Sequence, residues 1–154
     1  MVPGDRLFCI FLEPYTANYT FKDWPLHITI VPWFRTDISA EELGMEVDES
    51  LDEVEPFMVR VGVEARFGHR GRKLVNLIDL PSPLETIEKQ IRDILHAHHA
   101  WLVDETTKKH RAFRPHVTTQ KSGRLHEGNT FRCDSLYIVE QKGEYKEIVS
   151  RIAL

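Results

Sequence analysis

Hydrophobic and polar positions alternate along this chain with two different periods. Short apolar runs, or apolar residues at every second position, indicate strands. From Phe57 to Phe67 the alternation is regular, so its hydrophobic side chains are expected to share one face of a half-buried strand. Residues 68–71 then connect this strand to the next as a hairpin. Strands are predicted at residues 6–13, 26–34, 57–67, 73–80, 116–120, 135–141 and 147–152.

Two other segments repeat their apolar residues at intervals of three and four, as amphipathic helices do. The first is predicted to begin after Ser39, with Glu42 completing a capping box. The second begins after Ser82, where Pro83 occupies the first turn and Glu85 is the capping partner. The apolar stripe of the second helix is predicted to comprise Leu84, Ile87, Ile91, Leu95 or Ile94, His98 and Leu102.

The order strands, helix, strands, helix, strands predicts the fold class. Hairpins and short connections favour an antiparallel α+β architecture with two helices packed on sheet faces. No glycine-rich loop follows a strand, which argues against dinucleotide-binding and P-loop folds. A chain of 154 residues can bury one sizeable core, and no linker divides it. We therefore expect residues 1–154 to form a single domain.

Composition narrows the compartment and the partners. The chain has 20 basic and 24 acidic residues, so any contact with nucleic acid must use a local patch such as residues 66–73 or 108–114. Cys9 and Cys133 lack paired spacing, and buried free thiols are expected. The apolar run from Leu7 to Leu12 is far shorter than the ~20 residues of a membrane span, and no signal peptide is evident. A cytoplasmic protein that binds no membrane is expected.

The pattern His-x-Thr occurs twice, each time inside a strand-like run. The first copy is His27-Ile28-Thr29 and the second is His116-Val117-Thr118. Side chains alternate along a strand, so the histidine and threonine of each copy share one face while the middle residue enters the core. A proline lies two residues before the first copy and directly before the second. The repeated context predicts a functional pair of strands.

Two histidines that face each other across a cleft suit a reaction that needs a base and an acid together. With an ordinary pKa near 6.5, one imidazole can be neutral and the other protonated around neutral pH. Opening a 2′,3′-cyclic phosphate, or closing it, requires this division of roles. The hydroxyls of Thr29 and Thr118 could donate hydrogen bonds to the phosphate oxygens. The reaction needs neither a metal nor another cofactor.

With these motifs, the chain resembles the two-histidine phosphoesterases, which include 2′,5′ RNA ligase-like proteins and cyclic nucleotide phosphodiesterases. The HITI and PHVTT segments lie roughly 90 residues apart, and the order of strands and helices agrees along essentially the whole chain. The resemblance implies a bilobal, pseudo-two-fold α+β fold of antiparallel sheets with two main helices outside. It implies a central cleft in which His27 and His116 are catalytic and Thr29 and Thr118 clamp the phosphate. It also implies that the substrates are RNA ends or small cyclic nucleotides.

The sequence departs from the family after the second motif. Members often carry an apolar and then a basic residue there, whereas Thr119 and Gln120 come first in this chain and Lys121 lies one place later. How the phosphate or sugar is held is therefore open. Gln120 and Arg114 share the predicted face of His116, and Arg114 either contacts phosphate or is merely exposed.

Other candidates are weaker. Trp33 shares the predicted face of His27 and either stacks a nucleobase or is a rim or core tryptophan. His96 and His99 lie one turn apart, but a third metal ligand is not evident. Asp79 and Glu140 are strand carboxylates without a visible partner.

The sequence leaves alternatives open. The same cleft could bind a nucleotide or an RNA end without turning it over, or the sheet could serve only as an interaction surface. The direction of reaction, and which histidine is the acid, are also open. We expect a monomer.

Overall fold

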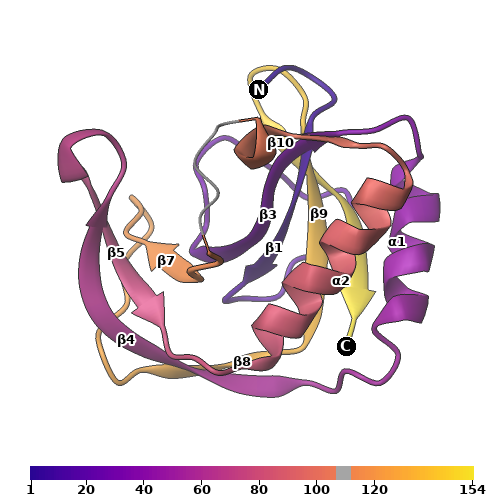
Figure 1. The fold of residues 1–154 in the computed structure, drawn as a ribbon. Helices are drawn as coiled ribbons and strands as arrows, with labels where there is room; N and C mark the ends of the chain where they lie inside the picture. The colour runs from indigo at the N-terminus through magenta and orange to yellow at the C-terminus, as the bar shows by residue number, and fades with distance from the viewer. Residues whose placement is uncertain (107–111) are drawn as a thin grey trace.

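The computed structural model describes residues 1–106 and 112–154. Within these ranges lie ten strands, two α-helices and two short 3₁₀-helices (Figure 1). The strands are β1 (Arg6–Phe11), β2 (Thr20–Phe21), β3 (His27–Arg35), β4 (Phe57–Phe67), β5 (Lys73–Ile78), β6 (Trp101–Leu102), β7 (His116–Thr118), β8 (Thr130–Cys133), β9 (Ser135–Gln141) and β10 (Lys146–Ala153). The helices are α1 (Ala40–Ser50), α2 (Pro83–Ala97), η1 (His69–Gly71) and η2 (Val103–Glu105). Strands β2, β6 and β8 were not predicted, because two to four residues are too few to show a period.

The strands form one curled antiparallel sheet. Their order is β2-β10-β9-β1-β3-β7-β5-β4-β8, and β6 pairs with the far end of β3. One half of the sheet contains β1, β3, β9 and β10, and the other contains β4, β5, β7 and β8. Figure 1 shows β4 curving beneath the molecule, so that the two halves face each other in part. The predicted bilobal α+β architecture is confirmed.

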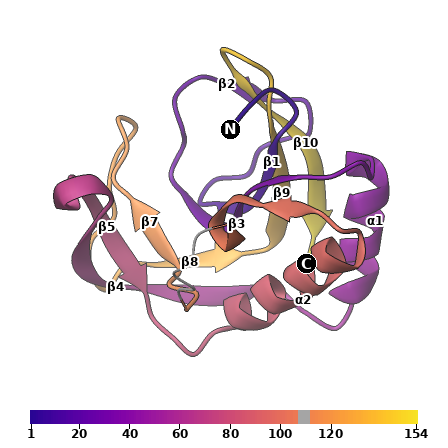
Figure 2. The ribbon, with the colours of Figure 1, turned by 45° about the horizontal axis from the view of Figure 1, so that its top comes forward.

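Both helices cover the same face of the sheet. Helix α1 packs on β10, α2 packs on β3, and the two helices touch each other (Figures 1 and 2). The main hydrophobic core fills the space between this face and the helices. It includes Ile28 of β3, Val117 of β7, Leu43 of α1 and Ile87 of α2, all nearly free of solvent contact. The sheet thus has a helix-covered face and an opposite face, which carries the candidate site.

Both helix starts have their predicted serine caps, but the complete capping box is present at α2 and only its serine half at α1. The Ser39 hydroxyl accepts a hydrogen bond from the backbone N–H of Glu42. Ser82 and Glu85 form the complete capping box of α2, with Pro83 as the first helical residue. These features depend on residues three positions apart, so local sequence is enough to specify them.

The end of α2 differs from the prediction. The helix ends at Ala97, and His99 takes a left-handed conformation with φ 56°. His98 is therefore not a core residue but an exposed one that pairs with Glu46 of α1. Leu102 is buried in β6 instead of extending the helical stripe. The sequence has no glycine at the turn to mark this helix end.

Strand β4 changes face halfway along its length. Its register against β5 shifts by one residue between Val61 and Glu64, so that Val61 pairs with Ile78 but Phe67 pairs with Lys73. Val61 consequently enters the helix-side core, whereas Phe67 lies on the opposite face. The predicted single apolar face was wrong, because a period of two counts residues and does not reveal the extra residue of a β-bulge.

A smaller hydrophobic cluster lies on the face opposite the helices. It is built on β1, β9 and β10 and is partly covered by the segment of residues 12–26. Cys9 belongs to this cluster and Cys133 to the main core; both are buried free thiols, as predicted. Burial raises the pKa of both thiols, which makes them poor nucleophiles. The buried members of the smaller cluster are Leu7, Cys9, Phe11, Phe21, Tyr137, Val139 and Ile148.

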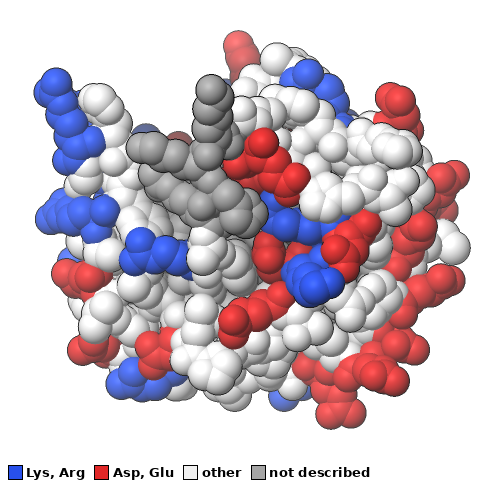
Figure 3. Space-filling model, in the orientation of Figure 1, with Lys and Arg blue, Asp and Glu red and all other residues white. Residues whose placement is uncertain are grey.

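Surface charge is unevenly distributed. Figure 3 shows Asp and Glu gathered on the side of α1, and Lys and Arg at the β4–β5 end of the molecule. The predicted basic run 66–73 lies at that end, while residues 108–111 of the second run lie outside the described residues. Over the described part of the chain, neither α-helix has the length and apolar character needed to cross a membrane.

Candidate active site

The two His-x-Thr strands lie side by side at the junction of the two halves of the sheet. Strands β3 and β7 are antiparallel neighbours, with Ile28 directly opposite Val117. Both middle residues are buried in the helix-side core. The flanking side chains must then project from the other face, where each histidine lies across from the threonine of the other strand. The four side chains brought together are His27, Thr29, His116 and Thr118, each half-buried.

Both imidazoles are oriented by the same backbone contact. Nδ1 of His27 lies 2.8 Å from the carbonyl oxygen of Pro25, and Nδ1 of His116 lies 2.8 Å from that of Arg114. A carbonyl oxygen only accepts, so each Nδ1 carries the proton and donates it. In the neutral ring, Nε2 is then unprotonated and able to act as a base. In both motifs the carbonyl belongs to the residue two positions earlier, as the pseudo-two-fold relation requires.

Burial lowers the pKa of both histidines. The pKa of His27 falls to about 4, mainly because burial disfavours the charged ring, and the nearby His116 lowers it further. Burial also lowers the pKa of His116, and the cations Arg114 and Lys73 act in the same direction. Both rings are therefore neutral at neutral pH in the free protein. This differs from the predicted division between a neutral and a protonated ring, which assumed ordinary pKa values.

Aromatic rings surround His27. The ring of Trp24 stacks on the imidazole, with centroids 4.3 Å apart and an interplanar angle of 29°. Phe11 approaches it edge-on at 6.2 Å. Trp33 lies one ring further away, 6.4 Å from Trp24, and packs against the smaller hydrophobic cluster. Trp24 was not predicted from the sequence, because it lies in a loop where no periodicity shows which way a side chain points.

Cations and one aromatic ring surround His116. The Phe67 and His116 rings meet edge to face with their centroids 4.7 Å apart, and the Arg114 guanidinium lies 4.9 Å from the Phe67 centroid. Lys73 pairs with Phe67 across the β4–β5 ladder and acts electrostatically on His116. Arg114 is thus on the side of the site, as predicted. Phe67 and Lys73 were missed, since the bulge in β4 conceals which face they share.

Comparison with known proteins identifies the family. The sequence model of the 2′-5′ RNA ligase superfamily matches residues 11–143. The chain belongs to this superfamily. The resemblance inferred from the two motifs is therefore confirmed. No protein of the curated collection matches the chain in sequence.

Solved structures of low sequence identity show the same fold. LigT of Escherichia coli, complexed with 3′-AMP, is 15% identical with a TM-score of 0.59, over 99% of each chain. TT0787 of Thermus thermophilus is 16% identical with a TM-score of 0.60, over 97% of each chain. Usb1 of Kluyveromyces marxianus is 10% identical with a TM-score of 0.55, over 99% of each chain. The architecture is thus that of 2′-5′ RNA ligase-like phosphoesterases.

The segment after the second motif is where this superfamily member departs from the common pattern. Strand β7 ends at Thr118, two residues earlier than predicted. Gln120 forms an isolated bridge with Gly123 and is half-buried. The Lys121 side chain is 83% exposed, and its ammonium lies 3.7 Å from a carboxylate oxygen of Asp23. This turn therefore reaches across to the loop that carries Trp24.

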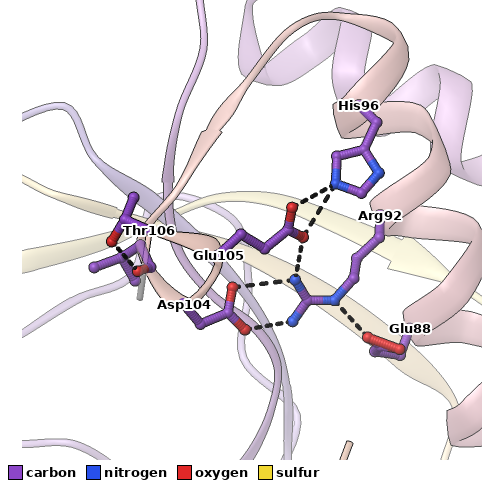
Figure 4. A network of polar contacts seen from close by, with 7 residues as sticks. Glu88, Arg92, His96, Asp104, Glu105 and Thr106 are labelled. Carbon is purple, nitrogen blue, oxygen red and sulfur yellow. Dashed lines mark hydrogen bonds and ion pairs between the residues drawn. The ribbon is translucent and has the colours of Figure 1, made fainter. Parts of the chain in front are cut away.

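The remaining polar candidates have partners of their own. Asp79 binds Arg60 at 2.8 Å, and Glu140 binds Arg6 at 2.9 Å. His96 contacts Glu105, within a network through which Arg92 binds Glu88, Asp104 and Glu105 (Figure 4). This network holds η2 against α2. Among residues 1–106 and 112–154, no group of three potential metal ligands is present.

Proposed function

We propose that this protein is a metal-independent phosphodiesterase that opens 2′,3′-cyclic phosphates, or makes or breaks 2′,5′ linkages, by paired-histidine acid–base catalysis. The observation that carries the proposal is the matched geometry of His27 and His116. Both rings project from adjacent strands onto one face, and both are held by a carbonyl at Nδ1, which leaves both Nε2 atoms available. Membership of the 2′-5′ RNA ligase superfamily supports the choice of substrate class.

The hydrolytic direction follows from this arrangement. Nε2 of one histidine removes a proton from water, and the water oxygen bonds to phosphorus. The bond between phosphorus and one ribose oxygen breaks, and the protonated second histidine gives its proton to that oxygen. Thr29 and Thr118 donate hydrogen bonds to the non-bridging oxygens, where negative charge increases. The reverse direction uses the same groups.

The substrate itself prepares the acid. Both histidines are neutral in the free protein because burial lowers their pKa values. A phosphate anion placed between them raises the pKa of the adjacent ring, since an opposite charge favours the protonated form. Arg114 neutralises part of the phosphate charge, and Trp33 and Gln120 contact the base or sugar of the substrate. Free enzyme and enzyme–substrate complex should therefore differ in protonation.

The test is turnover of 2′,3′-cyclic mononucleotides and of a short RNA ending in a 2′,3′-cyclic phosphate, with a chelator present. His27→Ala and His116→Ala are each expected to lower kcat/KM by about 10²–10⁴-fold, the usual contribution of a general acid or base. The exposed loop residue His126 provides a matched control, and His126→Ala should retain wild-type turnover. Retained turnover in either motif variant, with a native circular dichroism spectrum, would refute the assignment.

A second candidate function is nucleotide binding without turnover. The lowered pKa of both histidines favours it, because neither ring is an acid in the free protein. Tight binding of a cyclic nucleotide with no product after prolonged incubation would support this function over catalysis.

A further inference from the structure

A groove adjoins the candidate site on the side of His27. It has a volume of about 520 Å³ and is lined by Thr20, Phe21, Lys22 and Tyr145. It borders the short β2–β10 ladder, in which Phe21 lies opposite Lys146. The Tyr145 side chain is 41% exposed, so one ring of the groove is open to solvent.

The lining of the groove packs against the aromatic rings that surround His27. The Phe21 ring lies 5.0 Å from Trp24, and Trp24 stacks on His27. The Lys146 ammonium lies 5.4 Å from the Trp24 centroid and 6.0 Å from the Phe21 centroid. One indole ring therefore separates the groove from the imidazole, so a chain of nucleotides could occupy both places.

Charge around the groove is nearly balanced. Lys22 and Lys146 are cationic, and the Lys146 ammonium donates a hydrogen bond to the carbonyl oxygen of Lys22. Glu144 precedes the exposed tyrosine, and Glu147 lies opposite Thr20 in the ladder. Ring stacking should therefore contribute more than charge to any affinity for nucleic acid, and the salt dependence should be shallow.

We propose that this groove binds the nucleotide on the 5′ side of the reacting one in single-stranded RNA, with its base stacked on Tyr145 and its phosphate near Lys22 and Lys146. Single-strand binding sites combine open aromatic rings with cations near the backbone in this way. The inference rests on the proposed function and specifies its substrate class. The preferred substrate is an RNA end of at least two nucleotides, not a free cyclic mononucleotide.

The test compares Tyr145→Ala with Tyr145→Phe on two substrates, a 2′,3′-cyclic mononucleotide and a tetranucleotide RNA with a 2′,3′-cyclic end. Loss of one stacked base should lower kcat/KM for the RNA about 5- to 150-fold in Tyr145→Ala. Turnover of the mononucleotide should stay within about twofold, because its only base lies beside His27. Tyr145→Phe keeps the ring and should behave as wild type on both substrates.

Trp101 provides the matched control, since it is an equally exposed aromatic residue on β6, outside the groove. Trp101→Ala should leave kcat/KM unchanged for both substrates. If Tyr145→Ala lowers kcat/KM equally for both substrates, or leaves kcat/KM for the RNA unchanged, the proposed role of the groove is wrong.

A binding measurement separates this inference from the proposed function. Fluorescence anisotropy with a labelled tetranucleotide ending in a 3′-phosphate requires no turnover. If wild type binds the probe and Tyr145→Ala weakens binding about 5- to 150-fold, the proposed role of the groove is supported even when no cyclic substrate is hydrolysed. If the cyclic mononucleotide is hydrolysed but Tyr145→Ala binds the probe as wild type does, only the groove is overturned.

Discussion

Trp24 controls the environment of His27. Its ring stacks on the His27 imidazole, and Phe11 approaches the imidazole edge-on. These contacts exclude water from the histidine, and burial is the main cause of its lowered pKa. Under the proposed function, this loop side chain helps to keep the His27 imidazole neutral before substrate binds.

Replacing Trp24 should therefore change the titration of His27. In Trp24→Ala the pKa is expected to rise from about 4 toward the ordinary value of about 6.5, because water regains access to the ring. The measurement is an NMR titration of the imidazole resonances, supported by the acidic limb of the pH–rate profile. Trp33→Ala removes a ring one step further away and should shift the pKa much less. An unchanged pKa in Trp24→Ala would assign the shift to other contacts.

Sequence alone predicts side-chain placement only where a regular element determines it. His27 and Thr29 could be assigned to one face, because a strand alternates its side chains. The carbonyl that orients each imidazole could not be found, since it depends on how the chain enters the strand. Trp24 and its stacking depend on the folded path of the 12–26 segment, and no local pattern encodes that path.

At the scale of elements, the N-terminus of α2 gives a quantitative test. Ser82 accepts a hydrogen bond from the N–H of Leu84, and the Glu85 carboxylate accepts one from the N–H of Ser82. Ser82→Ala should lower the free energy of unfolding by about 1 kcal/mol, measured by urea denaturation. Thr86→Ala on the exposed side of the same helix should not destabilise the protein, because alanine is the better helix former. Equal stability of Ser82→Ala and wild type would show that the cap contributes nothing.

Strands were predictable in position but not in register. The limits of β4 matched the alternating pattern, yet its bulge reversed the side on which Phe67 lies. Strand β3 also shifts register against β1 at two places, by one residue each time and in the same direction, so that the total shift at Phe34 is two residues and the original alternation is restored there. Trp33 therefore lies on the predicted side even though the uniform alternation used to place it does not hold. Register shifts of this kind arise from pairing between distant segments.

At the scale of the whole molecule, the two half-buried histidines of the candidate site should make stability depend on pH. The folded-state pKa of His27 is about 4, whereas an unfolded histidine titrates near 6.5. Between these values the unfolded state binds more protons, so the free energy of unfolding falls as pH decreases through this window. His27 alone should account for about 2 kcal/mol between pH 7.0 and pH 4.5.

Urea denaturation at these two pH values checks the prediction. In His27→Gln, the free energy of unfolding should change less between the two pH values, because the contribution of His27 is removed. His126→Gln alters an exposed loop residue and should show the same change as wild type. The carboxylates with lowered pKa values, Asp5, Glu105 and Glu140, begin to lose their contribution as pH falls toward 4.5, but wild type and both variants share them, so they cancel in the comparison. An identical change in the free energy of unfolding between pH 7.0 and pH 4.5 in wild type and His27→Gln would contradict the argument that burial lowers the pKa of His27.

The junction of the two half-sheets has a consequence for quality control. Within the described part of the chain, the halves are hydrogen-bonded to each other where β3 meets β7. Each half could therefore contain an intact His-x-Thr strand and still lack the other half of the candidate site. Under the proposed function, a molecule whose halves are folded but not docked would be catalytically inactive. The specific activity of a purified sample would then measure the fraction of molecules in which β3 and β7 are correctly paired.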